Sequence, residues 1–173
     1  MRECKRLVDA GRRQFLSGAG MMTASAAAST LVSSNAMAAK PLARIEYPSN
    51  RLANIADLKL NEPLSVRYPD DQAPGVLLKL GVSLHDGVGP EQDIVGFSTV
   101  CPHKGYPLNY NTADRTLNCP GHYSRFDCEA AGQQIWGHAT QNLPQYVLRI
   151  DGKGDIYAEG IDELLYGRLS NVF

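Results

Sequence analysis

The sequence has no excess of charge of either sign, because 17 lysine and arginine residues stand against 18 aspartate and glutamate residues and the net charge is -1 at pH 7. A broad basic field that would attract nucleic acid or an anionic membrane surface is therefore absent. The chain also has no internal repeat, and no low-complexity tract outside its first 39 residues. With 43% hydrophobic residues, its 173 residues are typical of one globular domain preceded by a leader, and not of a disordered chain.

No long stretch has the periodicity of an amphipathic helix. Instead, 16 glycines and 10 prolines separate short apolar runs, which is typical of a β-rich chain with many turns. We therefore expect an all-β fold, an antiparallel β-sandwich or open barrel. The expected strands lie at residues 43–47, 64–68, 76–80 and 93–100, with a hairpin formed by 146–150 and 155–159. Residues 161–169 are expected to form one short helix or an irregular tail.

The first 39 residues read as an export signal. A basic start is followed by an uncharged, mildly apolar stretch at 14–39, and Ala36-Met37-Ala38 offers small residues at the spacing of a signal peptidase site. The run 11–16, with Arg12 and Arg13, resembles a twin-arginine signal, which serves proteins that are exported already folded. An ordinary secretory signal and a retained membrane anchor are the alternatives.

Cysteine is scarce, and its number excludes a closed disulfide framework. Cys4 belongs to the leader, so the mature chain would keep Cys101, Cys119 and Cys128, an odd set. At least one of these cysteines therefore has another role.

Two short runs pair a cysteine with a histidine. Cys101 and His103 are two residues apart, and Cys119 and His122 are three apart. If the two loops converge, they supply two sulfur and two nitrogen ligands. Such a set suits a tetrahedral zinc ion, or a 2Fe–2S cluster with both cysteines on one iron and both histidines on the other.

The pattern Cys-x-His-x-Gly at 101–105 and Cys-Pro-x-His-x-Ser at 119–124 resembles the cluster-binding boxes of Rieske iron–sulfur proteins, and residues 137–146 resemble the proline loop that covers the cluster. The resemblance covers about 100–146. It implies a Rieske domain at 40–173 with a small cluster-binding subdomain of two loops, behind a twin-arginine signal peptide at 1–39. It also implies one 2Fe–2S cluster, with Cys101 and Cys119 on the inner iron, His103 and His122 on the outer iron, and Ser124 donating to a bridging sulfide.

The chain departs from the family pattern at three positions. Tyr106 and Gly121 stand where many members have a pair of disulfide-bonded cysteines, so the two loops must be held by packing alone. Phe126 stands where high-potential members have a tyrosine that donates to a cysteine sulfur. We therefore expect a potential between those of quinol-oxidising members and dioxygenase ferredoxins. Cys128 and Trp136 are expected to be buried packing residues.

Among Rieske proteins, the chain resembles the small subunits of arsenite oxidase. That resemblance implies a periplasmic electron-transfer subunit. It would pair with a molybdopterin-containing large subunit, and a cytochrome c or small copper protein would accept the electrons. No nucleic acid partner and no stable membrane span after signal cleavage are expected. The alternatives are the Rieske subunit of a quinol–cytochrome c oxidoreductase, a ferredoxin of an aromatic-ring dioxygenase, and a zinc-stabilised β-domain without redox activity.

Overall fold

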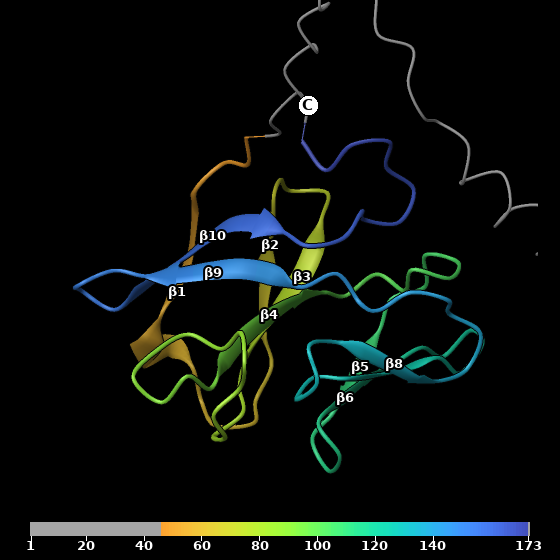
Figure 1. Ribbon diagram of the computed structural model, residues 1–173, viewed down its shortest axis with the longest axis horizontal. Helices are drawn as coiled ribbons and strands as arrows, with labels where there is room; N and C mark the ends of the chain where they lie inside the picture. Colours follow the sequence, from red (N-terminus) through yellow and green to blue (C-terminus); the bar gives the residue numbers. More distant parts are fainter. Residues whose placement is uncertain (1–45, 173) are drawn as a thin grey trace, which may run out of the picture. The chain divides into compact units, whose positions relative to one another are not determined.

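The computed structural model describes residues 46–172, and these contain ten strands and one short 3-10 helix (Figure 1). The elements are β1 (Asn50–Asn54), η1 (Ile55–Asp57), β2 (Leu64–Arg67), β3 (Pro74–Lys79), β4 (Ile94–Ser98), β5 (Asn109–Asn111), β6 (Thr116–Asn118), β7 (Arg125–Asp127), β8 (Gln133–Trp136), β9 (Tyr146–Ile150) and β10 (Asp155–Ile161).

The strands form three antiparallel sheets, with the orders β1-β10-β9, β2-β3-β4 and β5-β6-β7-β8. The last sheet is built entirely from residues between β4 and β9, so it is an insertion into the larger body of the domain. Figure 1 shows it beside β3 and β4, with the chain leaving β4 and returning to β9. An isolated bridge between Phe97 and Gln145 joins the two ends of this insertion.

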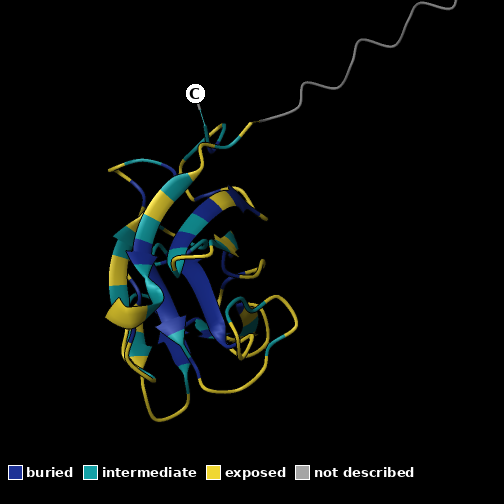
Figure 2. Cartoon of the chain, turned by 90° about the vertical axis from the view of Figure 1, so that its left-hand side faces the viewer, coloured by how far each residue is buried: buried dark blue, intermediate teal, exposed yellow. Residues whose placement is uncertain are grey.

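The central strands β3 and β4 are buried on both faces, which Figure 2 shows as dark strands. Successive side chains on a strand point to opposite faces. Leu77 and Ile94 therefore pack with Ile156 of β10, whereas Val76 and Phe97 pack toward the inserted sheet. This second core continues into the inserted part of the chain, where it includes Cys101, Leu108, Leu117, Cys119, Phe126, Cys128, Ala139 and Leu143. One apolar core thus fixes the inserted sheet to the rest of the domain.

The predicted all-β class is confirmed, and the expected strands at 64–68, 76–80 and 93–100 correspond to β2, β3 and β4. The predicted terminal hairpin is β9 and β10, whose strands pair from Ile156–Ile150 to Ile161–Tyr146. Residues 162–172, the described part of the tail after β10, contain no helix and consist of turns, bends and irregular backbone, so the irregular alternative was the correct one. The strand expected at 43–47 lies mostly outside the described residues, and residues 46 and 47 are not in a strand. The leader at 1–39 lies wholly outside them.

Candidate metal centre

The first ligand loop, residues 101–106, follows β4 and is closed by backbone hydrogen bonds. The N–H of Cys101 donates to the carbonyl of Tyr106 at 2.8 Å, and the N–H of Gly105 donates to the carbonyl of Cys101 at 2.8 Å. Gly105 adopts a left-handed φ of 71°, which glycine reaches without a steric penalty. This tight loop buries Cys101 and leaves His103 half-buried.

The second ligand loop, residues 119–124, lies between β6 and β7 and repeats the same backbone pattern. The N–H of Cys119 donates to the carbonyl of Ser124 at 2.8 Å, and the N–H of Tyr123 donates to the carbonyl of Cys119 at 3.1 Å. Tyr123 takes the left-handed position that Gly105 occupies in the first loop, with a φ of 59°. The two loops therefore present their cysteine and histidine on equivalent turns.

The structure brings the four predicted ligands together. The imidazole rings of His103 and His122 lie edge to face with centroids 4.8 Å apart. The side chain of Cys119 lies close enough to the thiol of Cys101 to contribute to the raised pKa of that thiol. The Nδ1 atoms of His103 and His122 are buried without a hydrogen-bond partner. Buried polar atoms almost always have a partner, so two orphaned imidazole nitrogens beside two buried thiols indicate a ligand.

The electrostatics of the loops suit neutral imidazoles and metal-bound thiolates. Burial, together with the nearby His122 and Lys104, lowers the pKa of His103 and favours the neutral ring that can bind a metal. Burial raises the pKa of Cys101, which opposes a free thiolate, while backbone N–H groups of His103 and Lys104 face its sulfur and lower the pKa in part. The same N–H groups would stabilise the sulfur of a bound cluster.

The donor set fits a two-iron cluster. Among residues 46–172, no group of three or more His, Cys, Asp or Glu side chains is arranged to hold a single metal ion. A Rieske cluster requires only two protein ligands at each iron, both cysteines on one and both histidines on the other. When bound, such a cluster takes up and releases one electron at a time.

Ser124 connects the second loop to the segment that covers it. Its fully buried Oγ accepts hydrogen bonds from the backbone N–H groups of His138 at 3.1 Å and Ala139 at 3.0 Å. These two bonds use the acceptor capacity of the hydroxyl and leave its proton available for donation. Gly137 permits the close approach, because an added Cβ there would lie 2.4 Å from the Cα of Ser124.

The ring of His138 lies near the rings of the two predicted ligands His103 and His122. Its exposed ring stacks on that of His103 with a centroid separation of 5.9 Å, and it lies 6.3 Å from the ring of His122. The structure therefore gathers three histidines at one end of the inserted sheet.

Two neighbouring positions were predicted as buried packing residues, with different outcomes. Cys128 is confirmed as a buried thiol, and burial raises its pKa to about 12. The prediction for Trp136 is wrong, since its side chain is 67% exposed at the end of β8. It lines a hollow of about 740 Å³ together with Cys119 and Tyr123. The short strand β8 is an edge strand that pairs only with β7 in its sheet.

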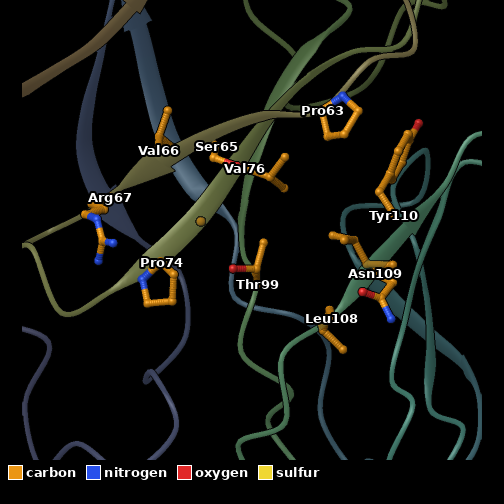
Figure 3. Close-up of a pocket in the computed structure, with 12 residues that line it drawn as sticks. Pro63, Ser65, Val66, Arg67, Pro74, Val76, Thr99, Leu108, Asn109 and Tyr110 are labelled. Atoms are coloured by element: carbon orange, nitrogen blue, oxygen red, sulfur yellow. The ribbon is translucent and has the colours of Figure 1, made fainter.

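A second hollow, of about 720 Å³, lies between β2 and β3 on one side and β5 and β6 on the other (Figure 3). Its lining includes Val66, Leu108 and Tyr110, and Arg67 is its one charged residue. None of the four predicted ligands lines it, so this hollow is separate from the metal centre.

A comparison with known protein families assigns this architecture. Residues 50–147 match the Rieske [2Fe-2S] domain, which is more than half of the chain. The chain belongs to the Rieske family. The predicted cofactor, one Rieske-type 2Fe–2S cluster, is thereby confirmed, and the match spans the whole stretch from β1 to the start of β9.

Individual Rieske relatives support the same assignment. The chain is 39% identical over 163 residues to iodate reductase subunit IdrB of Denitromonas iodatirespirans, covering 92% of this chain and 85% of the relative. It is 40% identical over 127 residues to the subunit of the same name from Pseudomonas sp. strain SCT. That match covers 72% of this chain and 66% of the relative. The soluble domain of Rieske protein II from Sulfolobus acidocaldarius has the same fold, with a TM-score of 0.64 at 23% identity, over 71% of this chain and 82% of that domain.

Within residues 46–172, no helix is long and apolar enough to cross a membrane.

Proposed function

We propose that this Rieske protein is the electron-transfer subunit of an exported molybdopterin oxidoreductase, with Cys101 and Cys119 on the inner iron and His103 and His122 on the outer iron. The observation that carries the ligand assignment is the pair of buried, unpartnered Nδ1 atoms beside two buried thiols. Ser124 would donate its remaining proton to a bridging sulfide. The half-buried histidines would give the electron a short path to a partner.

The enzyme that we propose is arsenite oxidase, because the sequence resembles its small subunits. Arsenite would lose two electrons at the molybdenum centre of the large subunit. The electrons would pass singly through this chain to a periplasmic cytochrome c or small copper protein. Substrate chemistry would then belong to the large subunit, and this chain would carry electrons only.

A second candidate is an iodate reductase, which the relatives named as iodate reductase subunits favour. In that case the electrons would flow in the opposite direction, from this subunit into the large subunit. By contrast, the match to the Rieske subunit of the cytochrome bc1 complex from Corynebacterium efficiens is short. It covers only 39% of this chain and 17% of that protein. The quinol–cytochrome c oxidoreductase alternative therefore has less support.

One experiment separates these functions. The subunit is purified with its natural partner, and its cluster is followed by electron paramagnetic resonance, which detects the reduced state. For arsenite oxidase, arsenite should reduce the oxidised cluster. For iodate reductase, iodate should instead oxidise a cluster that dithionite has reduced. A complex with a Cys101→Ser subunit should lose the signal, and a colourless wild-type protein with bound zinc would contradict both functions.

The proposed periplasmic location rests on Arg12 and Arg13 in a leader that is only mildly apolar. Replacing both arginines by lysine should keep the chain in the cytoplasm. A large subunit without its own signal should stay there as well. Normal export of the double variant, measured by fractionation and immunoblotting, would point to the general secretory route.

A further inference from the structure

The C-terminal segment contacts the first ligand loop although some 60 residues separate them in the sequence. The ring of Tyr166 lies against the backbone of Gly105, so that an added Cβ at Gly105 would fall 2.5 Å from Cε1 and 2.7 Å from Cδ1 of the tyrosine. Real Cβ atoms do not approach other atoms so closely. The absence of a side chain at Gly105 therefore allows the ring to rest directly on the loop backbone.

The segment that carries Tyr166 is fixed to the main body of the domain. Asn171 is 4% exposed, and its Oδ1 accepts the N–H of Leu165 at 2.8 Å. Its Nδ2 donates to the carbonyl of Glu163 at 2.8 Å and to the hydroxyl of Tyr47 at 2.9 Å. Two of these bonds tie Asn171, five residues after Tyr166, to Glu163 and Leu165 just before it, so the segment around the ring is closed on itself away from the ligand loops.

An ion pair also fixes this segment. The guanidinium of Arg168 forms two hydrogen bonds with the carboxylate of Asp70, one of them at 2.9 Å. Leu165 is buried in the core that also contains Tyr68 and Tyr146. The turn around Tyr166 is thus anchored on both sides by contacts that do not involve the metal centre.

Gly105, the residue of the first ligand loop that Tyr166 contacts, lies close in sequence to the predicted ligand His103. Gly105 follows His103 by two residues, and its N–H closes the loop on the carbonyl of Cys101. The next residue, Tyr106, packs on Gly121 and meets the ring of His122 edge-on with centroids 5.7 Å apart. Displacement of Gly105 would therefore be transmitted to both histidines.

We propose that Tyr166 is a positioning residue for the iron–sulfur cluster: its ring, held by the anchored C-terminal turn, presses on Gly105 and fixes the orientation of His103. The contact is made by ring carbons of Tyr166, and the hydroxyl oxygen is not among the atoms nearest to Gly105. The requirement is therefore for an aromatic ring and not for a phenol. This inference rests on the proposed ligand His103, and it is independent of the substrate of the partner subunit.

The test uses the full chain with its cluster, in three variants: Tyr166→Ala, Tyr166→Phe and Leu169→Ala. Leu169 is the matched control, because it lies in the same C-terminal segment, three residues after Tyr166, and is fully exposed. Two quantities are measured, the line shape of the reduced cluster in electron paramagnetic resonance and the rate at which an iron chelator bleaches its visible absorbance.

In Tyr166→Ala the cluster should bleach several-fold faster, and its paramagnetic resonance lines should be broader, because His103 would sample more orientations. Tyr166→Phe and Leu169→Ala should match the wild type. A Tyr166→Ala protein with wild-type line shape and bleaching rate would overturn the proposal, and so would an equal effect of Leu169→Ala. A lower melting temperature with an unchanged line shape would also overturn it, since that result describes a merely structural role. If His103→Ala kept the wild-type signal, the ligand assignment would fail, and the proposal would fail with it.

A double-mutant cycle provides a second test that does not depend on one variant. Gly105→Ala forces the new methyl group against the Tyr166 ring, in addition to the strain of its left-handed φ. Removal of the ring by Tyr166→Ala should relieve the clash with the new methyl group. The cluster of the double variant should therefore bleach more slowly than the product of the two single-variant rate increases predicts. Strictly multiplicative effects would mean that the two residues do not act on the cluster through their contact.

Discussion

The phenol ring of Tyr106 lies on the backbone of Gly121, and an added Cβ at Gly121 would fall 2.9 Å from the Cγ of that ring. These are the two positions at which many Rieske proteins have disulfide-bonded cysteines. A packing contact therefore stands at the pair of positions where the sequence predicts that packing replaces the bridge. A glycine and a tyrosine can replace the bridge because the missing side chain at Gly121 makes room for the ring face.

Removal of this ring should loosen the loops. Tyr106→Ala should lower the stability of the holoprotein by roughly 1–2 kcal/mol, since the ring is half-exposed and only its buried part contributes. Tyr106→Phe should retain the wild-type stability, because the contact with Gly121 uses ring carbons. The temperature at which half of the cluster has bleached measures the stability of both variants. Equal midpoints for Tyr106→Ala and the wild type would show that other contacts hold the loops.

The midpoint potential should respond to two buried positions beside the cluster. Phe126→Tyr should raise the potential by some tens of millivolts, because it adds a donor toward a cysteine sulfur, and such bonds stabilise the reduced state. Ser124→Ala should lower it by a similar amount. Phe126→Leu is the control, because it removes the ring and adds no donor. Protein film voltammetry measures the potentials, and an equal shift for Phe126→Leu would attribute the effect to packing.

Asp93 is a fully buried carboxylate that depends on Lys79. The ammonium of Lys79 lies 3.4 Å from Oδ2 of Asp93 and 3.0 Å from Oε2 of the exposed Glu91. Lys79→Ala should destabilise the domain by about 2–3 kcal/mol, since it leaves a buried charge without its cation. Glu91→Ala removes only the exposed partner and should cost at most about 0.5 kcal/mol. Equal effects of the two substitutions in thermal unfolding would contradict this account.

The ion pair that anchors the C-terminal turn should make stability depend on pH. Hydrogen bonding to Arg168 lowers the pKa of Asp70 below its ordinary value of 3.8. The pair therefore stabilises the fold fully above that ordinary value, and the contribution is lost as the pH falls through the lowered pKa. Arg168→Ala should cost about 1 kcal/mol or less at neutral pH, because the Asp70 side chain is 42% exposed.

The difference in thermal midpoint between the wild type and Arg168→Ala should accordingly shrink from neutral pH toward about pH 3. Arg67→Ala supplies the control, since Arg67 donates to the backbone carbonyl of Asp71, which does not titrate. A difference that stays constant for Arg168→Ala, or that shrinks equally for both variants, would contradict the assignment to Asp70.

Cys128 should be inert in the folded protein. The thiolate is the reactive form, and burial raises the pKa of this thiol to about 12. Iodoacetamide at about pH 8 should therefore leave Cys128 unmodified in the native holoprotein and alkylate it after unfolding. Mass spectrometry of the peptide that contains Cys128 provides the measurement, and stoichiometric labelling of the native protein would show that the site opens.

The sequence by itself determined the fold class, and it predicted the donor set that the structure brings together. Alternation of short apolar runs with turns predicted β2, β3, β4 and the terminal hairpin, because a strand that is buried on one or both faces must be apolar at those positions. The two cysteine–histidine runs were recognisable because their spacing is local. Each loop is only six residues long, so its geometry is largely set by its own residues.

Only the tertiary structure decided which distant residues meet. The exposure of Trp136 could not be read from the sequence, because an aromatic residue on a short strand is buried or exposed according to what covers that strand. The contact of Tyr166 with Gly105 likewise has no local signal, since it depends on how a turn fixed by Asn171 and Arg168 lies against a loop far away in the chain. Local composition specifies which elements form, whereas the packing of the whole chain specifies which of their surfaces touch.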